Sequence, residues 1–211
     1  MRIWKLFITV LFIALPVCYG LNLLASIQPK NSDDYLAIYT LGSEGLAENY
    51  FPGDQADILP GTQLSWYVGV YNHMSTLMLV KVEFKLLNLT MQGPDQVNGI
   101  PSQRDAFFDE TQLLLSNETW TLPVVWSVGT TASMSGNTTE IHSLVFNNDT
   151  LTNNVETPAL SGFNYRIVIE LWVYNDATGA FAFQWTANGN QQVAWNEIWF
   201  NMTRISLLPG S

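Results

Sequence analysis

An uncharged stretch near the amino terminus places the strongest constraint on this chain. No Asp, Glu, Lys or Arg occurs from Leu6 to Gln28, and most residues in this range are Leu, Ile, Val or Phe. About 20 apolar residues suffice for a helix to cross the hydrocarbon core of a bilayer. The basic residues Arg2 and Lys5 precede the stretch, and acidic residues follow it at 33 and 34. By the positive-inside rule, this pattern predicts a cytoplasmic amino terminus and an extracellular remainder.

A cleaved secretory signal is the alternative interpretation of this segment. Cys18 and Gly20 could occupy the two small-residue positions of a cleavage site after Gly20. The apolar stretch nevertheless continues to Ile27, whereas a signal peptide has an apolar region of about 7 to 15 residues. We therefore interpret residues 1–30 as a retained signal anchor, a single transmembrane helix whose partner is membrane lipid. Residues 31–211 would form one extracellular domain.

Charge and cysteine content exclude several classes of function. The chain has 18 acidic and 8 basic residues, which gives a formal net charge of -10. Nucleic acid requires a basic surface that offsets its phosphates, so nucleic-acid binding is excluded. Cys18 is the only cysteine and lies in the apolar stretch, so the extracellular part has no cysteine for a disulfide, a zinc site or a nucleophile.

The extracellular part has the pattern of β-strands separated by turns. Its apolar segments are short, rich in Val, Ile, Thr and aromatic residues, and bounded by Gly, Pro, Asn and Asp. Several alternate with a period of two; Leu64, Trp66 and Val68, for example, would share one buried face. The expected strands are 35–41, 63–71, 79–87, 120–128, 140–146, 165–174, 180–186 and, less regularly, 195–203.

This number of short strands, with almost no helical periodicity, predicts an all-β fold. We expect an immunoglobulin-like antiparallel β-sandwich. Three polar connections, 88–110, 133–140 and 147–161, are expected to be exposed loops. Buried aromatics of a sandwich would explain most of the eight tryptophans. Four aromatic residues near the carboxyl end would mark an interface if they were exposed, namely Trp185, Trp195, Trp199 and Phe200.

One segment resembles a known family. Residues 39–50 read YTLGSEGLAENY, Pro52 follows after Phe51, and residues 68–73 read VGVYNH. This pattern is similar to the extracellular part of an archaeal membrane-protein family catalogued as domain of unknown function 1616. The resemblance implies a sandwich displayed outside an archaeal membrane, and it implies no activity.

The residues of this motif have expected structural roles. Gly42 and Gly45 permit turn conformations that other residues resist. Asn72 and His73 end a strand, where a side chain can bond to free backbone groups. We therefore expect this segment to serve the fold rather than to bind a ligand.

Five Asn-x-Thr sequons mark candidate glycosylation sites on an exported chain. Their asparagines are Asn88, Asn117, Asn137, Asn148 and Asn201. The polar loops expected around Asn137 and Asn148 favour these two sites.

A metal site remains a further hypothesis. His73 and His142, with nearby methionines at 74, 78 and 134, are residue types that bind copper. A blue-copper centre also needs a cysteine thiolate, which the extracellular part lacks. Strand-end histidines are more often occupied by hydrogen bonds, and the acidic groups around Asp54, Asp105 and Asp109 lack the spacing of a calcium loop. We assign no metal or cofactor.

No motif indicates an enzyme. The chain has no nucleophile elbow, zinc-protease motif, phosphate-binding glycine loop or dinucleotide fingerprint. The sequence favours a membrane-anchored binding or scaffold module of the archaeal cell envelope, which contacts other envelope proteins through a sheet edge or an apolar loop. One alternative is a metal- or ligand-binding accessory domain that uses the two histidines. The other is a hydrolase of envelope polymers, which would need paired carboxylates in a cleft.

Overall fold

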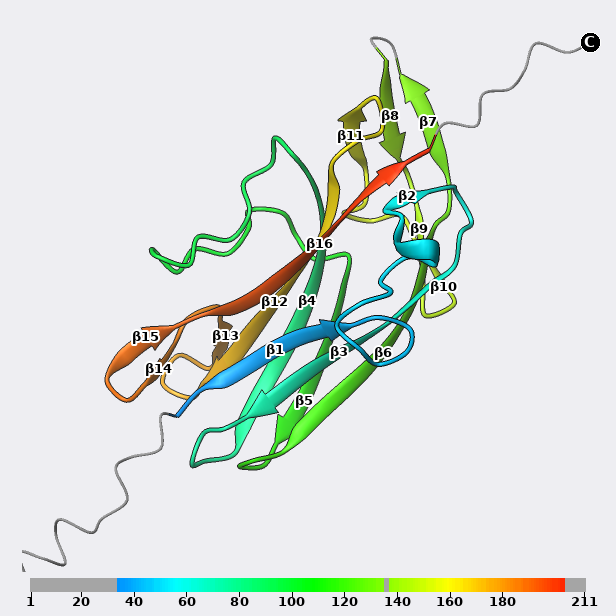
Figure 1. The fold of residues 1–211 in the computed structure, drawn as a ribbon. Helices are drawn as coiled ribbons and strands as arrows, with labels where there is room; N and C mark the ends of the chain where they lie inside the picture. The colour runs from blue at the N-terminus through cyan, green and yellow to red at the C-terminus, as the bar shows by residue number, and fades with distance from the viewer. Residues whose placement is uncertain (1–33, 135–136, 204–211) are drawn as a thin grey trace, which may run out of the picture. The chain divides into compact units, whose positions relative to one another are not determined.

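The structure is a computed structural model that describes residues 34–134 and 137–203. The expected membrane anchor and the whole of the apolar stretch lie outside these residues. Within the described ranges, no helix has both the length and the apolar character that a membrane span requires. These ranges form an all-β, mainly antiparallel fold, which confirms the expected fold class at that level (Figure 1).

Two main sheets make up most of the domain. The first sheet contains, in spatial order, β1 (Leu36–Leu41), β3 (Leu64–Asn72), β6 (Thr119–Val128), β9 (Leu144–Phe146) and β10 (Asp149–Leu151), all antiparallel. The second sheet contains β2 (Asp57–Ile58), β16 (Ala194–Met202), β12 (Tyr165–Asn175), β4 (Met78–Asn88) and β5 (Phe108–Leu114). The short strand β13 (Ala180–Ala182) also pairs with β12, and the β2–β16 pair is parallel.

Smaller elements complete the domain. A third sheet consists of β11 (Thr157–Leu160), β8 (Thr138–Ile141) and β7 (Thr131–Met134). A hairpin joins β14 (Trp185–Ala187) to β15 (Asn190–Gln192), and a single 3-10 turn spans Pro52–Asp54.

The core lies between the two main sheets, because each of the long strands turns its apolar residues to the same side. In β3 the buried positions alternate, and the cluster continues through Val82 and Phe84 of β4 and Ile169 of β12. Aromatic rings pack against each other across the sheets: the ring centroids of Trp126 in β6 and Phe200 in β16 are 5.3 Å apart. The arrangement is therefore sandwich-like, with one continuous core.

Six of the eight expected strands are confirmed, and each of their ends lies within one residue of the observed end. They correspond to β1, β3, β4, β6, β12 and β16. The single strand expected at 140–146 is wrong. It is two strands, β8 and β9, in different sheets, because both Ser143 and Leu144 are buried and the alternation changes phase there. The strand expected at 180–186 is likewise divided into β13 and β14.

The loops expected at 88–110, 133–140 and 147–161 are wrong in part, since they contain strands. Strand β5 was hidden because Asp109, Glu110 and Thr111 are all exposed, as a strand with one neighbour allows. Strand β11 includes Pro158, which fits because β11 is an edge strand and needs no N–H there.

Candidate functional site

The connection from β4 to β5, residues 89–107, projects from the sheets (Figure 1), and several side-chain hydrogen bonds anchor it to neighbouring elements. We call it the β4–β5 loop. Its direction is set by Asn88, which is buried at the end of β4. The Asn88 Oδ1 accepts hydrogen bonds from the backbone N–H groups of Thr90 and Met91, at 2.9 and 3.0 Å. Its Nδ2 donates to the carbonyl of Pro158 at 2.6 Å.

A buried ion pair holds the second half of the loop. Lys85 and Glu170 occupy outward positions of β4 and β12, because their neighbours along each strand face the core. Lys85 Nζ lies 2.7 Å from Glu170 Oε2. The loop covers this pair: both the backbone N–H and the hydroxyl of Ser102 donate to Glu170 Oε1, at 2.8 and 2.6 Å. Burial of the charges is tolerated because each partner is hydrogen-bonded.

The residues around this pair form a charged and aromatic cluster on the outward face of the second sheet. Trp172 Nε1 donates to Glu170 Oε2 at 3.3 Å, and Glu83 lies 3.3 Å from Lys85 Nζ. Glu83 also pairs with Lys81, whose ammonium lies over the Trp172 ring at 5.4 Å. The cluster therefore has no unpaired cation.

Two arginines fix other parts of the loop. Arg166 of β12 donates from Nη2 to the carbonyl of Met91 and from Nη1 to Glu197 Oε2, both at 2.8 Å. Its guanidinium also stacks on Trp199, with the central carbon 4.8 Å from the ring centroid. Arg104, within the loop, donates to the carbonyls of Asn154 and Glu156. Partial burial lowers the pKa of Arg104, and the nearby Asp105 and Glu156 partly offset this effect.

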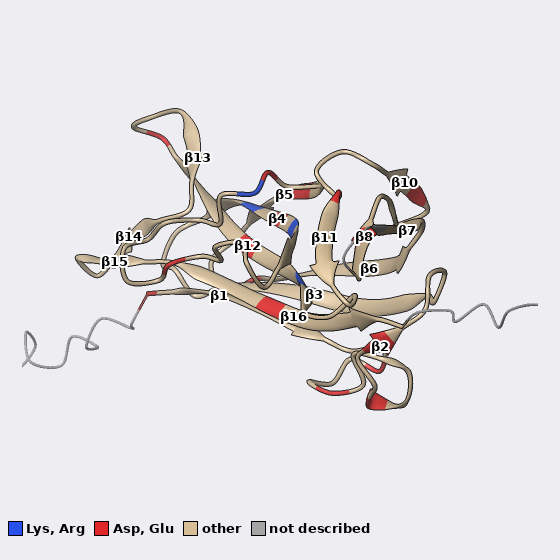
Figure 2. Ribbon diagram, turned by 90° about the horizontal axis from the view of Figure 1, so that it is seen from above, with Lys and Arg blue, Asp and Glu red and all other residues tan. Residues whose placement is uncertain are grey.

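All four basic residues of the described ranges are used in this region, Lys81, Lys85, Arg104 and Arg166. Figure 2 shows the blue Lys and Arg positions gathered around β4, β12 and the adjoining loop, whereas acidic residues are spread over the domain. The sequence carried no signal that Ser102 would close over Lys85 and Glu170, because that contact joins residues far apart in the chain.

The tip of the loop is a tight, hydrogen-bonded turn. Asp95 and Ile100 exchange two backbone hydrogen bonds, at 2.7 and 3.0 Å. Asp95 Oδ1 accepts from the backbone N–H groups of Val97 and Asn98, and Oδ2 accepts from Asn98 Nδ2 at 2.6 Å. These hydrogen bonds lower the pKa of Asp95, and the bond from the Asn98 side chain has the largest effect. Outside the tip, Gln184 Nε2 donates to the carbonyl of Asn98.

This tip presents apolar side chains to solvent. Val97 is 93% exposed and Ile100 is 45% exposed at the tip, and Leu89, at the start of the loop, is 64% exposed. A rigid loop that carries exposed apolar residues can bind a partner with little loss of conformational entropy, since it is already ordered. The β4–β5 loop is therefore the strongest candidate binding surface in the described part of the chain.

The carboxyl-terminal aromatics do not form the expected exposed patch. Phe200 and Trp185 are buried, at 1% and 7% exposure, and Phe200 belongs to the core. Trp199 is half-buried against Arg166, and Trp195 is also half-buried. The condition of exposure under which these four residues would mark one interface is therefore not met; in β16, alternation directs Phe200 inward and its neighbours outward.

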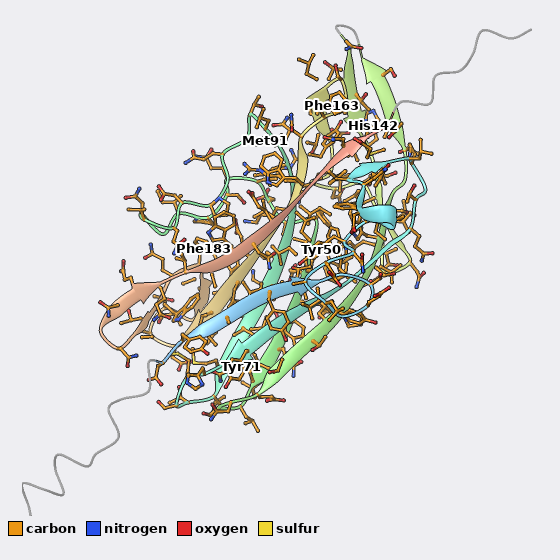
Figure 3. All side chains as sticks on the ribbon, in the orientation of Figure 1. Tyr50, Tyr71, Met91, His142, Phe163 and Phe183 are labelled. Carbon is orange, nitrogen blue, oxygen red and sulfur yellow. The ribbon has the colours of Figure 1, made fainter. Side chains whose placement is uncertain are left out.

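The structure does not bring the two histidines together. His73 Nδ1 lies 3.1 Å from the hydroxyl of Tyr71, whereas His142 neighbours Glu140 in the β7–β8 region. Figure 3 shows Tyr71 and His142 at opposite ends of the domain. Met74 is buried, and within residues 34–134 and 137–203 no three His, Cys, Asp or Glu side chains are grouped as metal ligands.

The five sequon asparagines have different surroundings. Asn88 and Asn201 are held in β4 and β16 by side-chain hydrogen bonds. The other three are exposed, and each has a positive φ in a turn between strands: Asn117, Asn137 and Asn148.

The motif segment has mostly structural contacts, as expected. Gly42 donates its N–H to the carbonyl of Leu46 at 2.8 Å, and a Cβ there would overlap the Glu48 carbonyl. Gly45 has a φ of +74°. The turn role of Gly45 is confirmed. Gly42 has no positive φ, and glycine is needed there because the Glu48 carbonyl lies too close for a Cβ. The segment also lines a polar cavity of about 310 Å³ together with Gln63.

Asn72 caps backbone groups, as predicted, but His73 does not use its ring in this way. The Asn72 Nδ2 donates to the carbonyls of Thr76, Leu114 and Leu115, and its Oδ1 accepts from the N–H of Met74. The side chain thus joins the β3–β4 and β5–β6 connections.

Two residues with carboxylate side chains line an open cavity of about 740 Å³ at the base of the β4–β5 loop. Asp105 and Glu156 both line it, together with Arg104 and polar residues of the 152–154 segment. Arg104 is committed to backbone carbonyls there.

Comparisons with known proteins identify no family. No known protein family and no curated protein matches the sequence. Among solved structures, the domain is similar to the FixG-related protein from Vibrio parahaemolyticus, with 8% sequence identity and a TM-score of 0.31, over 82% of this chain and 99% of that one.

Proposed function

We propose that this protein is a membrane-anchored, outward-facing module of an archaeal cell envelope, which binds another envelope protein through the β4–β5 loop. In this proposal it binds and does not catalyse. The observation that carries the proposal is Val97, an apolar side chain that is 93% exposed on a loop held by a buried ion pair. Anchoring in the membrane rests on the uncharged stretch from Leu6 to Gln28.

We also propose that the domain is an immunoglobulin-like sandwich. The order β1-β3-β6 in the first sheet and β16-β12-β4-β5 in the second supports this, because the chain crosses between the two main sheets from β3 to β4 and again from β5 to β6, as it must in a sandwich of two antiparallel sheets. Sandwiches of this class commonly bind partners through the loops at their ends. The β4–β5 loop, which connects adjacent strands of the second sheet, is such a connection.

Several contacts favour the loop over other exposed apolar residues. Isolated exposed leucines are normal on a protein surface and indicate nothing. The loop differs because both the backbone N–H and the hydroxyl of Ser102 bond to Glu170, the buried partner of Lys85, and so tie the loop to the second sheet. Ordering a long loop in the absence of a partner is costly, and this suggests that its shape is functional.

Site-specific cross-linking tests the proposed binding surface. A photoreactive amino acid at position 97 of the full-length protein, in its native membrane, should form an adduct of defined mass. The same group at Leu46, which is 51% exposed on another loop, is the matched control. Substitution of Ser102 by Ala should weaken the adduct at 97, since it removes a bond that orders the loop. Equal adducts at both positions would argue against the loop as the binding surface.

Protease added to intact cells tests the orientation. Export predicts that the domain is degraded without lysis. Degradation only after lysis would contradict both the membrane topology and the proposed role.

A further inference from the structure

The folded domain leaves only some of its five sequons open to modification. We propose that N-linked glycans are attached to Asn117 and Asn148 after folding, and that Asn88, Asn137 and Asn201 remain bare. This inference rests on the export of the domain in the proposed function.

The chemistry of attachment defines what must be accessible. Nδ2 of the asparagine forms a bond to the anomeric carbon of a lipid-linked oligosaccharide phosphate. The bond from that carbon to the phosphate oxygen breaks, the phosphate leaves with its lipid, and the amide gives one proton to the leaving phosphate or to a base of the transferase. The first condition is therefore that the asparagine Nδ2 is accessible and not held by other contacts. The second is that the transferase can reach the hydroxyl two residues further on, since the acceptor motif includes it.

Asn117 and Asn148 satisfy both conditions. Asn117 lies in the β5–β6 turn and Asn148 in the β9–β10 turn, with φ of +62° and +73°. Both asparagines are exposed, and so are Thr119 and Thr150, the hydroxyl residues of the two motifs. Asn117 Nδ2 has only a 3.3 Å contact with the adjacent Ser116, and within the described residues no hydrogen bond is made by the Asn148 side chain.

Asn88 and Asn201 fail the first condition. The nitrogen of Asn88 donates to the Pro158 carbonyl at 2.6 Å, in a residue that is 7% exposed. In Asn201 the nitrogen donates to Asp57 and the oxygen accepts from the backbone N–H of Asn164, both at 2.9 Å. A glycan on either nitrogen would displace these contacts between strands.

Asn137 fails the second condition. The asparagine is exposed, although its Nδ2 donates to the Ser161 hydroxyl at 2.7 Å, but Thr139, two residues on, is only 6% exposed in β8. Its carbonyl accepts the Tyr165 hydroxyl at 2.6 Å, and its own hydroxyl is enclosed close to Gly162. A transferase that meets the folded domain cannot reach this hydroxyl, whereas one that meets the unfolded chain can. Asn137 therefore reports whether attachment follows folding.

The two open sites suit the proposed binding surface. In Figure 1 the β5–β6 and β9–β10 turns lie away from the projecting β4–β5 loop, so glycans on them would leave the loop uncovered.

Glycopeptide mass spectrometry of the full-length protein from its native host tests this inference. We expect glycans on Asn117 and Asn148 and unmodified peptides for the other three. Thr119→Ala and Thr150→Ala should each remove one glycan, whereas Thr119→Ser and Thr150→Ser should retain it. These variants keep the turn asparagines, so folding is not challenged at the positive-φ positions.

The possible failures are distinguishable. If protease degrades the domain on intact cells, the domain is exported. Exported protein with no glycan on Asn117 or Asn148 would then overturn this inference and leave the proposed function standing. A glycan on Asn88, Asn137 or Asn201 would overturn attachment after folding. A domain that protease reaches only after lysis would overturn the inference together with the proposed function.

Discussion

At the scale of single residues, buried polar side chains determine how the connections between strands are held. Asn72 is completely buried and bonds to two connections at one end of the domain. Its capping role was predictable, because an asparagine at a strand end has few other uses. Which carbonyls it reaches was not, since Thr76 and Leu115 come together only after β4 and β5 have paired.

Asn72→Ala should destabilise the domain. The change leaves buried carbonyls without a donor and the Met74 N–H without an acceptor. We expect a loss of about 2–3 kcal/mol in the free energy of unfolding, measured by chemical denaturation. Asn175→Ala removes only one exposed bond, to the N–H of Ala177, and serves as the control. A loss at position 72 no larger than at 175 would contradict the capping role.

The buried ion pair makes a second prediction at this scale. Lys85→Met should cost about 3–5 kcal/mol, because it leaves Glu170 buried and charged without its partner. In the double variant Lys85→Met with Glu170→Gln, the unpaired negative charge of Glu170 is removed, and the glutamine still offers an oxygen acceptor to Ser102. Denaturation of both single variants and the double variant should therefore show the double variant to be more stable than Lys85→Met alone. Strict additivity would mean that the two side chains are not coupled.

At the scale of elements, apolar alternation located the strands that have a clear buried face, including the edge strand β1, and missed edge strands with several exposed polar residues such as β5. The expected strands 63–71 and 165–174 were confirmed because each lies between neighbours over the core. Strand β5 has one neighbour and exposes Asp109 and Glu110, so its sequence resembles a loop. The β4–β5 loop was expected as an exposed connection. Its anchoring was not predictable, because Ser102 and Arg104 bond to strands and loops distant in sequence.

The tip of the β4–β5 loop should depend on pH. The hydrogen bonds from Asn98 and Val97 favour charged Asp95 and lower its pKa from the ordinary value of 3.8. The order that they give to the tip is fully present above that ordinary value and is lost as the pH falls through the lowered pKa. NMR of the Val97 and Asn98 amides should therefore show a titration with a midpoint below 3.8.

Two variants make this pH prediction specific. Asn98→Ala removes the largest cause of the shift, so the pKa of Asp95 should rise toward its ordinary value. Gln96→Ala, at an exposed neighbour, should leave the midpoint unchanged. An equal midpoint in all three proteins would show that the Asn98 side chain does not stabilise the charged carboxylate.

At the scale of the whole molecule, one core serves both main sheets, so their stabilities should be linked. The sequence indicated the apolar faces but not their pairing. Nothing in the chain order predicts that Phe146 of β9 packs against Phe84 of β4, with the two ring centroids 5.1 Å apart. The same limit explains why the sequence left open whether Phe200 is exposed, since its place in the core depends on what the opposite sheet supplies.

Phe84→Ala tests this linkage. The ring is fully buried and contacts Phe107, Phe108 and Phe146, so its loss should cost about 3–5 kcal/mol. Because the cavity would lie between the sheets, amide hydrogen exchange should accelerate to a similar extent in β3 and β6 of the first sheet and in β12 of the second. Leu160→Ala, at a residue that is 69% exposed, should leave exchange in both sheets unchanged. Faster exchange confined to the second sheet would instead show that the two sheets unfold separately, and the single core would then not be the unit that stabilises this domain.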